Sequence, residues 1–186
     1  GYRVRLAGNI GLPLLACEDR AVDWWVVELS SYQLADLQAA PDISVILNLS
    51  TEHLDWHGSV ERYRQDKLRL VCLAADKPVV ANAGDPVLKA ALGGRKNIVW
   101  FNSGSGIQAS GSGLRDGGNE LPALIPEGLP GLHNLSNLAA ALTALRLTGA
   151  DLQSAMKSLP AFPGLAHRLQ TLGKQGDLQF VNDSIS

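Results

Sequence analysis

Three largely apolar runs, each followed by a segment of helical periodicity, restrict the folds that this chain can adopt. The runs cover residues 23–29, 43–49 and 78–81. A strand that is apolar on both faces must be covered on both faces, which is typical of parallel sheets flanked by helices. The sequence therefore predicts an α/β fold in which helices pack on both faces of a parallel sheet.

Capping residues and glycines give the ends of the expected helices. Ser59 is suited to cap a helix over 60–75, and Asp151 a helix over 151–159. A long helix is expected to begin at Asn134 or Ser136 and to end at Gly149. Further strands are expected over 2–7, 97–101, 167–172 and 178–181, and further helices over 13–18, 32–38 and from Asp85-Pro86. The Gly/Ser-rich segment 103–118 is expected to form either a loop or a hairpin with 121–125.

Composition narrows the functional class. Of the 186 residues, 46% are hydrophobic and 18% are charged, as in an ordinary globular protein. The net charge of −2 has both signs scattered, which argues against a nucleic-acid or anionic-membrane surface. No apolar run approaches the roughly 20 residues of a membrane span. Cys17 and Cys72 are expected to be core thiols, which indicates a reducing, cytoplasmic compartment.

A dense group of potential ligands follows the second apolar run. Glu52, His53, Asp55 and His57 lie within six residues. The spacing of the two histidines resembles zinc clusters of hydrolases, but zinc needs a third or fourth nitrogen or sulfur donor, and none lies nearby. Oxygen ligands with one imidazole suit Mg²⁺ better. Magnesium is therefore the favoured hypothesis, with a zinc hydrolase as the alternative.

Lys67 lies on the apolar side of the expected helix over 60–75. The apolar stripe comprises Val60, Tyr63, Val71, Ala74 and Ala75, whereas Glu61, Arg62, Gln65, Asp66 and Arg69 fall on the opposite side. A lysine in such a stripe often packs its stem and keeps its ammonium in water. Since this face must meet the strand end that carries the ligand group, a functional Lys67 is the better hypothesis. Burial disfavours a charged amine, and a neutral amine is nucleophilic and can be modified.

Further polar residues follow the other expected strands. Asn9 follows the first, Glu28 and Ser30 close the second, and Asn82 ends a later one. Glu28 closes an apolar strand, where a carboxylate is costly unless an ion pair or a metal ion compensates it. Ligands bind at the carboxyl ends of parallel strands, so these residues are expected to meet at one edge of the sheet.

A nucleotide could be held by the second half of the chain. Asn134 and Asn137 place two amides at a helix N-terminus, where simple capping needs only one, so a base or a phosphate is a possible ligand. Arg168 could clamp a phosphate, and Asp183 could accept from a ribose hydroxyl.

Eight motifs of this chain together resemble the Mur ligase family. In order they are Gly8-Asn9-Ile10-Gly11, Glu28-Leu29-Ser30-Ser31-Tyr32-Gln33-Leu34, Asn48 to Gly58, Tyr63-Arg64-Gln65-Asp66-Lys67, Asn82-Ala83-Gly84-Asp85, Gly131-Leu132-His133-Asn134-Leu135-Ser136-Asn137, His167-Arg168 and Asn182-Asp183-Ser184. The second motif resembles the members that add glutamate to UDP-N-acetylmuramoyl-L-alanine. The resemblance implies an ATP-dependent amide ligase of peptidoglycan precursor synthesis that works through an acyl phosphate.

The resemblance also implies a role for each matching residue. Glu28, His53 and Lys67 would hold Mg²⁺, with Lys67 carbamylated, so that His53 and Lys67 are also the catalytic candidates. Asn134 and Asn137 would hold adenine, Arg168 the γ-phosphate and Asp183 the ribose. Asn9, and more weakly Ser30, would contact the UDP-muramoyl substrate. ATP, Mg²⁺, glutamate and the UDP-linked substrate are the implied ligands of a monomeric enzyme.

The chain departs from the family pattern in two respects. It lacks the Gly-x-x-x-x-Gly-Lys-[Ser/Thr] phosphate loop, which is expected directly before Gly1, and most of a C-terminal domain. We therefore expect residues 1–162 to form a P-loop-NTPase-like central domain that lacks its phosphate loop. Residues 163–186 are expected to form the first strands of a Rossmann-like glutamate-binding domain. The 186-residue chain alone is expected to be inactive as a ligase. Where D-glutamate enzymes continue Lys-Ala-Thr, this chain has Ile185-Ser186, similar to a group suspected of using L-glutamate. A related ligase for another amino acid or a polyglutamate tail, and a non-catalytic nucleotide-binding module, remain alternatives.

Overall fold

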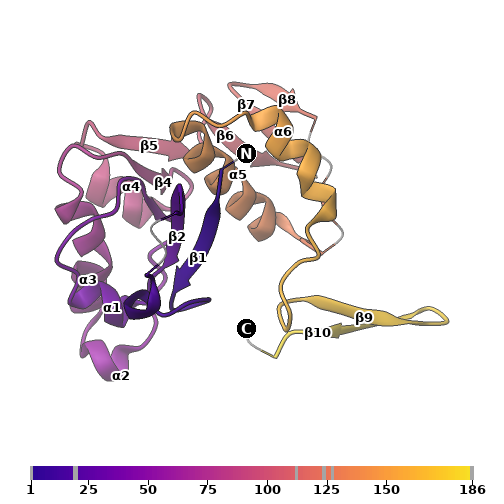
Figure 1. The fold of residues 1–186 in the computed structure, drawn as a ribbon, viewed down its shortest axis with the longest axis horizontal. Helices are drawn as coiled ribbons and strands as arrows, with labels where there is room; N and C mark the ends of the chain where they lie inside the picture. The colour runs from indigo at the N-terminus through magenta and orange to yellow at the C-terminus, as the bar shows by residue number, and fades with distance from the viewer. Residues whose placement is uncertain (1, 19–20, 112, 123–124, 127, 185–186) are drawn as a thin grey trace. The chain divides into compact units, whose positions relative to one another are not determined.

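The computed structural model divides the chain into two compact units (Figure 1). Unit 1 comprises Gly1–Pro41 and Leu49–Ala75, and unit 2 comprises Asp42–Asn48 and Asp76–Ser186. The structure describes residues 2–18, 21–111, 113–122, 125–126 and 128–184. The chain passes from one unit to the other three times, so neither unit is a continuous stretch of sequence. The boundary expected at residue 162 lies inside unit 2 and stays a prediction.

Unit 1 is built on a pair of parallel strands and three α-helices. Strand β1 (Val4–Gly8) pairs with β2 (Trp24–Glu28), and Gly8 lies opposite Glu28 at the carboxyl end. The helical elements are η1 (Leu14–Ala16), α1 (Ser31–Ala35), α2 (Leu54–His57) and α3 (Val60–Leu73). Helix α1 packs against α3, and α2 also contacts α3. The predicted apolar stripe of α3 is confirmed in part: Tyr63, Val71 and Ala74 are buried, Val60 is half-buried and Ala75 is exposed.

Gly8 is required by the close approach of β1 and β2. Its φ of +106° lies in the region that favours glycine, and an added Cβ would lie 2.1 Å from the carbonyl oxygen of Glu28. The next residue, Asn9, donates its backbone N–H to that same carbonyl at 2.8 Å. Gly8 thus lets the chain turn directly over the end of β2 and places Asn9 beside Glu28.

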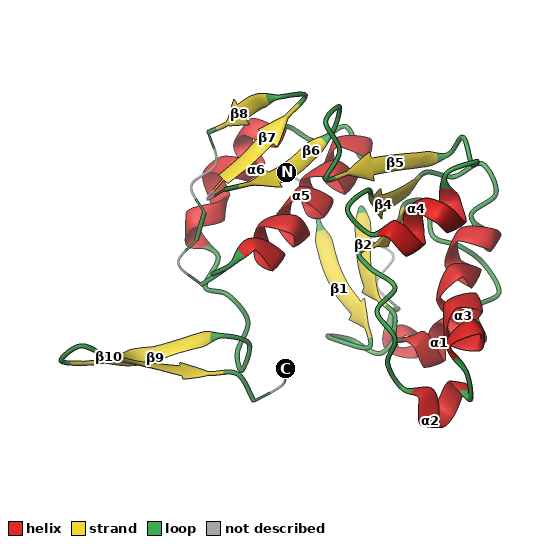
Figure 2. Cartoon of the chain, turned by 180° about the vertical axis from the view of Figure 1, so that it is seen from behind, coloured by secondary structure: helices red, strands yellow, loops and turns green. Residues whose placement is uncertain are grey.

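Unit 2 contains a parallel sheet, an antiparallel sheet and a hairpin (Figure 2). The parallel sheet has the order β3-β4-β5, formed by β3 (Ser44–Ile46), β4 (Val79–Asn82) and β5 (Ile98–Phe101). The antiparallel sheet comprises β6 (Ile107–Ser110), β7 (Gly113–Asp116) and β8 (Asn119–Leu121), and the hairpin comprises β9 (Gln170–Gln175) and β10 (Leu178–Asn182). The helical elements are α4 (Pro86–Leu92), α5 (Leu132–Leu147), α6 (Leu152–Ser158) and η2 (Leu159–Ala161).

Helix α5 organises the core of unit 2. It packs against β4, β5, β6 and β7, and so joins the two sheets. The buried cluster around it includes Val80, Phe101, Ile107, Leu138 and Leu142. Burying one such side chain contributes about 1.5–3 kcal/mol, so this cluster is a large part of the stability of unit 2. The N-terminal turn of α5 is held by the same packing.

Most expected elements are confirmed, including the α/β class with parallel strands. The two predicted caps are also confirmed: Ser59 accepts from the N–H of Arg62, and Asp151 from Gln153 and Ser154. Asp85, where a short helix was expected to start, caps α4 by accepting from Val87 and Leu88. These side chains accept bonds that the first turn of a helix cannot make internally, which is why short polar residues mark helix starts so reliably.

Several expectations were wrong. Among the described residues the parallel strands form two separate sheets rather than one. The Gly/Ser-rich segment 103–118 itself supplies strands β6 and β7, because glycines with positive φ lie in its turns. Of the segment 121–125, which was expected to pair with it in a hairpin, residues 123–124 lie outside the described residues. Helix α5 begins at Leu132, after Gly131, and not at Asn134 or Ser136. The segment after Pro13 forms only one 3-10 turn.

Two side chains of the described structure also differ from their expected exposure. Cys72 is exposed and Cys17 is half-buried, so neither is a core thiol. None of the helices in the described part of the chain is both long and apolar enough for a membrane span.

We expect Gly8→Ala to lower the free energy of unfolding by about 3 kcal/mol or more, because the new Cβ meets a backbone carbonyl and the residue keeps a left-handed φ. Urea unfolding followed by circular dichroism measures this. Gly104→Ala is the matched control, since nothing lies within 4 Å of its added Cβ. Equal unfolding curves for the two variants would contradict the close approach.

A second prediction concerns the pH dependence of stability at α6. Hydrogen bonds from the Ser154 hydroxyl and the Gln153 backbone N–H hold the pKa of Asp151 below its usual value. A carboxyl whose pKa is lower in the folded state stabilises the fold above its unfolded pKa, and this contribution disappears as the pH falls through the folded pKa.

Asn caps a helix about as well as Asp but does not titrate. The melting temperature of the wild type should therefore fall more steeply than that of Asp151→Asn between about pH 5 and pH 2. If the melting temperatures of the two proteins fall equally with pH over this range, the ionised Asp151 side chain does not contribute to stability as predicted.

Candidate functional site

The carboxyl ends of β1 and β2 bring Asn9 and Glu28 together. The backbone bond from Asn9 to Glu28 fixes the two residues side by side, and both side chains are exposed. In the described part of the chain no side-chain partner satisfies the Glu28 carboxylate. The ion pair considered for this residue is therefore absent there, and its oxygen atoms are available to a ligand.

Ser30 caps helix α1. Its hydroxyl accepts from the backbone N–H of Gln33 at 3.3 Å, and the Gln33 side chain accepts from the backbone N–H of Ser30 at 2.9 Å. This reciprocal pair is a capping box, which stabilises a helix start. Ser30 therefore has a structural role that explains its position, and its predicted contact with substrate stays untested.

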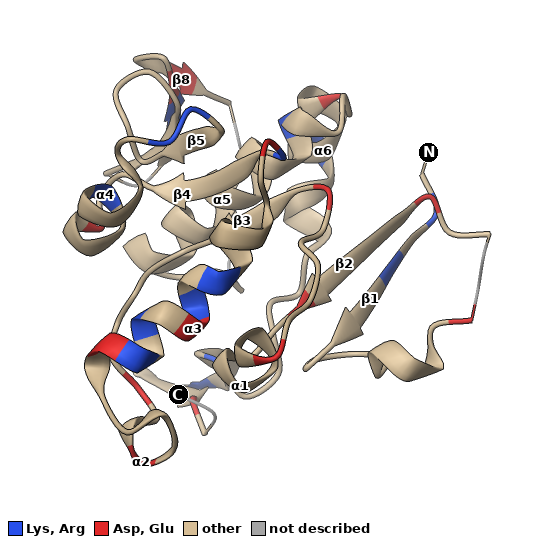
Figure 3. Ribbon diagram, turned by 90° about the vertical axis from the view of Figure 1, so that its left-hand side faces the viewer, with Lys and Arg blue, Asp and Glu red and all other residues tan. Residues whose placement is uncertain are grey.

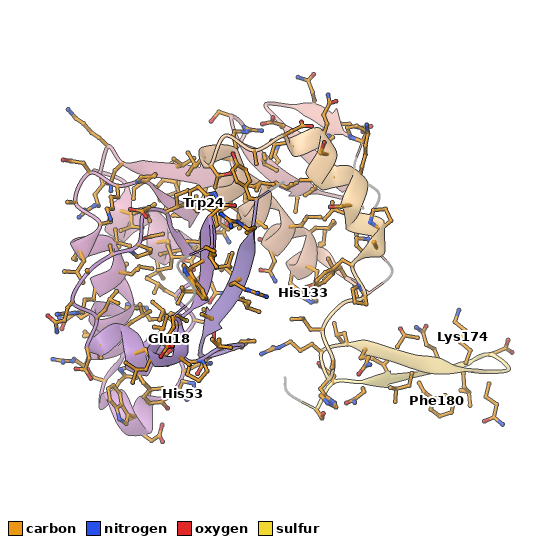
Figure 4. The ribbon with its side chains drawn as sticks, viewed as in Figure 1. Glu18, Trp24, His53, His133, Lys174 and Phe180 are labelled. Carbon is orange, nitrogen blue, oxygen red and sulfur yellow. The ribbon has the colours of Figure 1, made fainter. Side chains whose placement is uncertain are left out.

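His53 occupies a strained position at the start of α2 (Figure 4). Its φ and ψ of 54° and 39° are left-handed, which is uncommon for a residue other than glycine and costs of the order of 1–3 kcal/mol. Strain of this kind gathers at functional sites. The His53 ring is exposed and packs on the ring of Tyr32, whose centroid is 5.2 Å away.

His57 is not available as a metal ligand. Its side chain is 0% exposed, its Nδ1 lies 2.8 Å from Asp66 Oδ2, and its Nε2 lies 3.0 Å from Ser31 Oγ. Both ring nitrogens are thus occupied by protein atoms. The zinc hypothesis required His53 and His57 in one cluster, and no group of three His, Cys, Asp or Glu that could hold a metal is found among the described side chains. The zinc alternative is therefore wrong for this structure.

Asp66 was expected on the polar side of α3 and is instead buried. It accepts from His57 and is also paired with Arg62, whose Nε lies 3.1 Å from Asp66 Oδ1. Charged residues recur along α3 (Figure 3). Helical periodicity alone did not reveal Asp66 as buried; the signal lay in its partner, a histidine nine positions earlier.

Lys67 is half-buried, next to Tyr63. Its ammonium donates to the Tyr63 hydroxyl at 3.1 Å and lies 5.3 Å from the centre of that ring. The Tyr63 ring in turn packs edge-on against His57 at 5.1 Å. The described contacts of the amine are therefore with Tyr63, a buried residue of the same helix. The role of Lys67 at a metal site stays a prediction.

In unit 2, Asn134 and Asn137 lie three residues apart on the first turns of α5 and therefore on one face of it. The Asn134 amide donates to the carbonyl of Pro130 at 2.8 Å, while Asn137 is exposed. The helix start is marked by Gly131, with a φ of 89°, and by His133, which Figure 4 labels. One amide thus secures the approach to the helix and the other is free to meet a ligand.

Arg168 and Asp183 are brought together at the base of the β9–β10 hairpin. Asp183 accepts from the backbone N–H of Leu169 at 3.1 Å, and Asn182 contacts the His167 ring at 2.9 Å. His167 and Leu169, on either side of Arg168, both have left-handed φ values of 64° and 45°. Arg168 is therefore presented, exposed, by a constrained turn.

A pocket of about 310 Å³ lies between the start of α5 and this hairpin. It is lined by Pro130, Gly131, His133, Leu169, Thr171, Gln179 and Val181. The pocket adjoins the helix turn that carries Asn134 and the turn that carries Arg168. A helix N-terminus beside apolar side chains offers donors for a phosphate or a base edge and a surface for an aromatic ring.

A network of amides at the tips of the parallel strands was not foreseen. Asn102, in a left-handed conformation, donates to Asn82 Oδ1 at 3.0 Å and to Ser136 Oγ at 2.8 Å. Asn82 also donates to the carbonyl of Leu47 at 3.1 Å. The ends of β4 and β5, and the backbone that follows β3, are thereby linked to the first turns of α5. Asn82 was predicted as a polar strand end, but the sequence gave no signal that Asn102 and Ser136 would bind to one another beside it.

The predicted site residues thus fall into two groups. Asn9, Glu28, Ser30, His53 and Lys67 belong to unit 1, and Asn134, Asn137, Arg168 and Asp183 belong to unit 2. In unit 1, contacts connect β1 with β2, and α3 with α1 and α2. The expectation that all the strand ends meet at one edge stays a prediction.

Comparison with known proteins places these residues in a family context. Residues 6–145 match the family model of the Mur ligase middle domain. The chain is 40% identical over 191 residues to the UDP-N-acetylmuramoyl-L-alanine--L-glutamate ligase of Xanthomonas oryzae pv. oryzae (strain MAFF 311018), with 100% of this chain and 41% of the relative covered.

Two further relatives differ in the acceptor that their names state. The UDP-N-acetylmuramoyl-L-alanine--L-glutamate ligase of Xylella fastidiosa (strain Temecula1 / ATCC 700964) is 41% identical, covering 100% of this chain and 41% of the relative. The UDP-N-acetylmuramoylalanine--D-glutamate ligase of Caulobacter vibrioides (strain NA1000 / CB15N) is 38% identical, covering 99% and 43%. The chain spans about two fifths of the length of these relatives.

Solved structures support the fold. MurF ligase from Thermotoga maritima, solved in complex with ADP, superposes with a TM-score of 0.77 at 21% identity, covering 98% of this chain and 47% of that one. MurF from Acinetobacter baumannii gives a TM-score of 0.71 at 18% identity, covering 98% and 50%.

Proposed function

The chain belongs to the Mur ligase family, and on that premise we propose that it forms the nucleotide- and metal-binding part of an ATP-dependent ligase. The proposed reaction joins glutamate to UDP-N-acetylmuramoyl-L-alanine in peptidoglycan precursor synthesis. The observation that carries the proposal is the arrangement of unit 1. It combines an exposed carboxylate that has no side-chain partner in the described part of the chain, a strained histidine and a half-buried lysine. The His57 ring links the segments that carry them, because it contacts Ser31, shortly after Glu28, and Asp66, next to Lys67.

The donors of unit 1 fit magnesium. Mg²⁺ keeps several waters and is bound by one or two carboxylates together with substrate phosphates, so it does not require a cage of protein ligands. Glu28 would supply a carboxylate oxygen and His53 a ring nitrogen. When bound, the ion neutralises charge on the phosphates of ATP. The Glu28 carboxylate, which has no side-chain partner among the described residues, is the group that such a cation would satisfy.

Lys67 would contribute after modification. A neutral Lys67 amine can attack the carbon of CO₂, so that a new C–N bond forms, a π electron pair moves to oxygen, and the amine releases one proton to solvent. The product is a carbamate, whose oxygens are ligands of the type that magnesium prefers. The half-buried position of the amine beside Tyr63 supports this role.

The nucleotide would bind at unit 2. The pocket at the start of α5 suits an adenine ring, Asn134 and Asn137 could hold its polar edge, and Asp183 could accept from the ribose. Arg168 is the proposed partner of the γ-phosphate, because a guanidinium matches phosphate geometry. Asn9, beside Glu28, is the proposed contact to the UDP-linked substrate, with Ser30 a weaker one.

The proposed chemistry is two displacements. A substrate carboxylate oxygen attacks the γ-phosphorus, the bond to ADP breaks, and an acyl phosphate forms. The neutral amine of glutamate then attacks the acyl carbon, phosphate leaves with the C–O bonding pair, and the amine loses a proton. The residues of this chain would act by positioning the reactants and neutralising their charge. We propose L-glutamate as acceptor, since the ending Ile185-Ser186, which lies outside the described residues, resembles the L-glutamate group and relatives with that name match the chain.

The experiment is a coupled assay of ADP release and amide formation on the longest natural form of the chain, run with L- and D-glutamate. We expect product with the L enantiomer and a loss of at least about a hundredfold in Glu28→Gln, because an uncompensated phosphate charge raises the barrier. Asp55→Asn, a nearby carboxylate outside the proposed site, is the control and should retain activity. ATP binding without amide formation by either enantiomer would favour the non-catalytic module.

A separate prediction concerns Lys67. Isotopically labelled bicarbonate should yield a carbamate resonance that disappears in Lys67→Arg, since a guanidinium does not react with CO₂. Activity lost in Lys67→Ala should return in part on addition of a short carboxylic acid, which replaces the carbamate oxygens. Wild-type activity in Lys67→Ala without any added acid would refute a role for the modified lysine.

A further inference from the structure

We propose that His57 is a positioning residue of the metal site. Its imidazole fixes the one-turn helix α2, and through that helix the ring of His53, relative to the elements that carry Glu28 and Lys67. The inference rests on the proposed function, because it concerns how the metal-binding side chains of that site are held. His57 itself touches neither metal nor substrate in this proposal.

The first step is the direct link between His57 and His53. The backbone N–H of His57 donates to the carbonyl of His53 at 3.1 Å, and the N–H of Gly58 donates to Leu54 at 2.9 Å, which closes the single turn of α2. A turn of this length is not stable by itself, since nucleating a helix costs more than one turn regains. Its orientation must therefore come from side-chain contacts.

The His57 ring supplies those contacts to two other helices. The Asp66 carboxylate can only accept, so Nδ1 at 2.8 Å donates to it and Nε2 faces the Ser31 hydroxyl at 3.0 Å. Ser31 lies three residues after Glu28, and Asp66 directly precedes Lys67. One buried ring thus connects the segments that carry all three proposed metal-binding residues.

Aromatic packing continues the same link. The Tyr32 ring stacks on His57 at an interplanar angle of 22° and also contacts the His53 ring. On the other side of His57, the Tyr63 ring leads to the amine of Lys67. Direct contacts therefore connect His53 to Lys67 through three intervening rings.

A purely structural His57 would act on the stability of unit 1 and not on the metal site in particular. The two roles differ in one respect. If His57 acts through His53, removing the His53 ring should abolish the effect of a His57 substitution on metal affinity. An effect through stability alone should persist without that ring.

The experiment titrates Mn²⁺ into the longest natural form of the chain and follows free Mn²⁺ by electron paramagnetic resonance. The variants are Glu28→Gln, His53→Ala, His57→Ala and the double variant of both histidines. Val71→Ala, which removes buried side-chain volume from α3 of the same unit, is the matched control for lost stability. Melting temperatures are measured in parallel.

We expect His57→Ala to weaken Mn²⁺ binding about tenfold or more, as is typical of residues that orient metal ligands. The double variant should bind no more weakly than His53→Ala, and Val71→Ala should bind as the wild type does. Ser31→Ala removes only the hydrogen bond between Ser31 and the His57 ring, so it should reduce the Mn²⁺ affinity less than His57→Ala does. If His57→Ala does not fold, the Mn²⁺ affinity of Ser31→Ala tests the positioning role instead.

Two outcomes separate the proposals. If Glu28→Gln leaves Mn²⁺ affinity unchanged, the proposed metal site itself is wrong. If Glu28→Gln weakens binding but His57→Ala and Ser31→Ala do not, or if the losses of the two histidine variants add, the positioning role is overturned while the proposed function stands.

Discussion

The buried imidazole of His57 is the constraint on which the arrangement of unit 1 depends. Three helices of that unit meet at this ring, and both of its nitrogens face polar partners on different helices. A buried polar group that loses its partner costs about 1–3 kcal/mol, so each helix is held in the position that satisfies the ring. The strained backbone of His53 is maintained by its neighbours and not by its own preference.

Sequence patterns predicted the fold where local physics decides the structure. Apolar runs predicted parallel strands. Ser59, Asp85 and Asp151 predicted helix starts to within one residue, because capping depends on a few adjacent atoms. For the antiparallel sheet β6-β7-β8 the sequence left a loop and a hairpin open, since the strands are short and the glycines also suit a loop. Strand pairing depends on partners distant in sequence, which periodicity does not contain.

In the candidate site, too, features set by local sequence could be predicted, and features set by partners distant in sequence could not. An inward-facing Lys67 could be inferred from helical periodicity, and exposed strand ends could be inferred from the order of strands. Buried polar pairs could not, because Asp66 looks like a solvated residue until the histidine opposite is known. For the same reason His57 was counted among the potential metal ligands: composition identifies a potential ligand, and only contacts reveal whether its nitrogens are already occupied.

The chain passes between its two units three times, and this limits how one unit can be separated from the other. Residues 42–48 supply strand β3 to one unit, yet the sequence on both sides of them belongs to the other. Neither unit can be removed or exchanged as one continuous stretch of sequence without separating strand β3 from the sheet that it forms with β4 and β5. Strand β3 can therefore reach its partner β4 only through a connection that runs through unit 1.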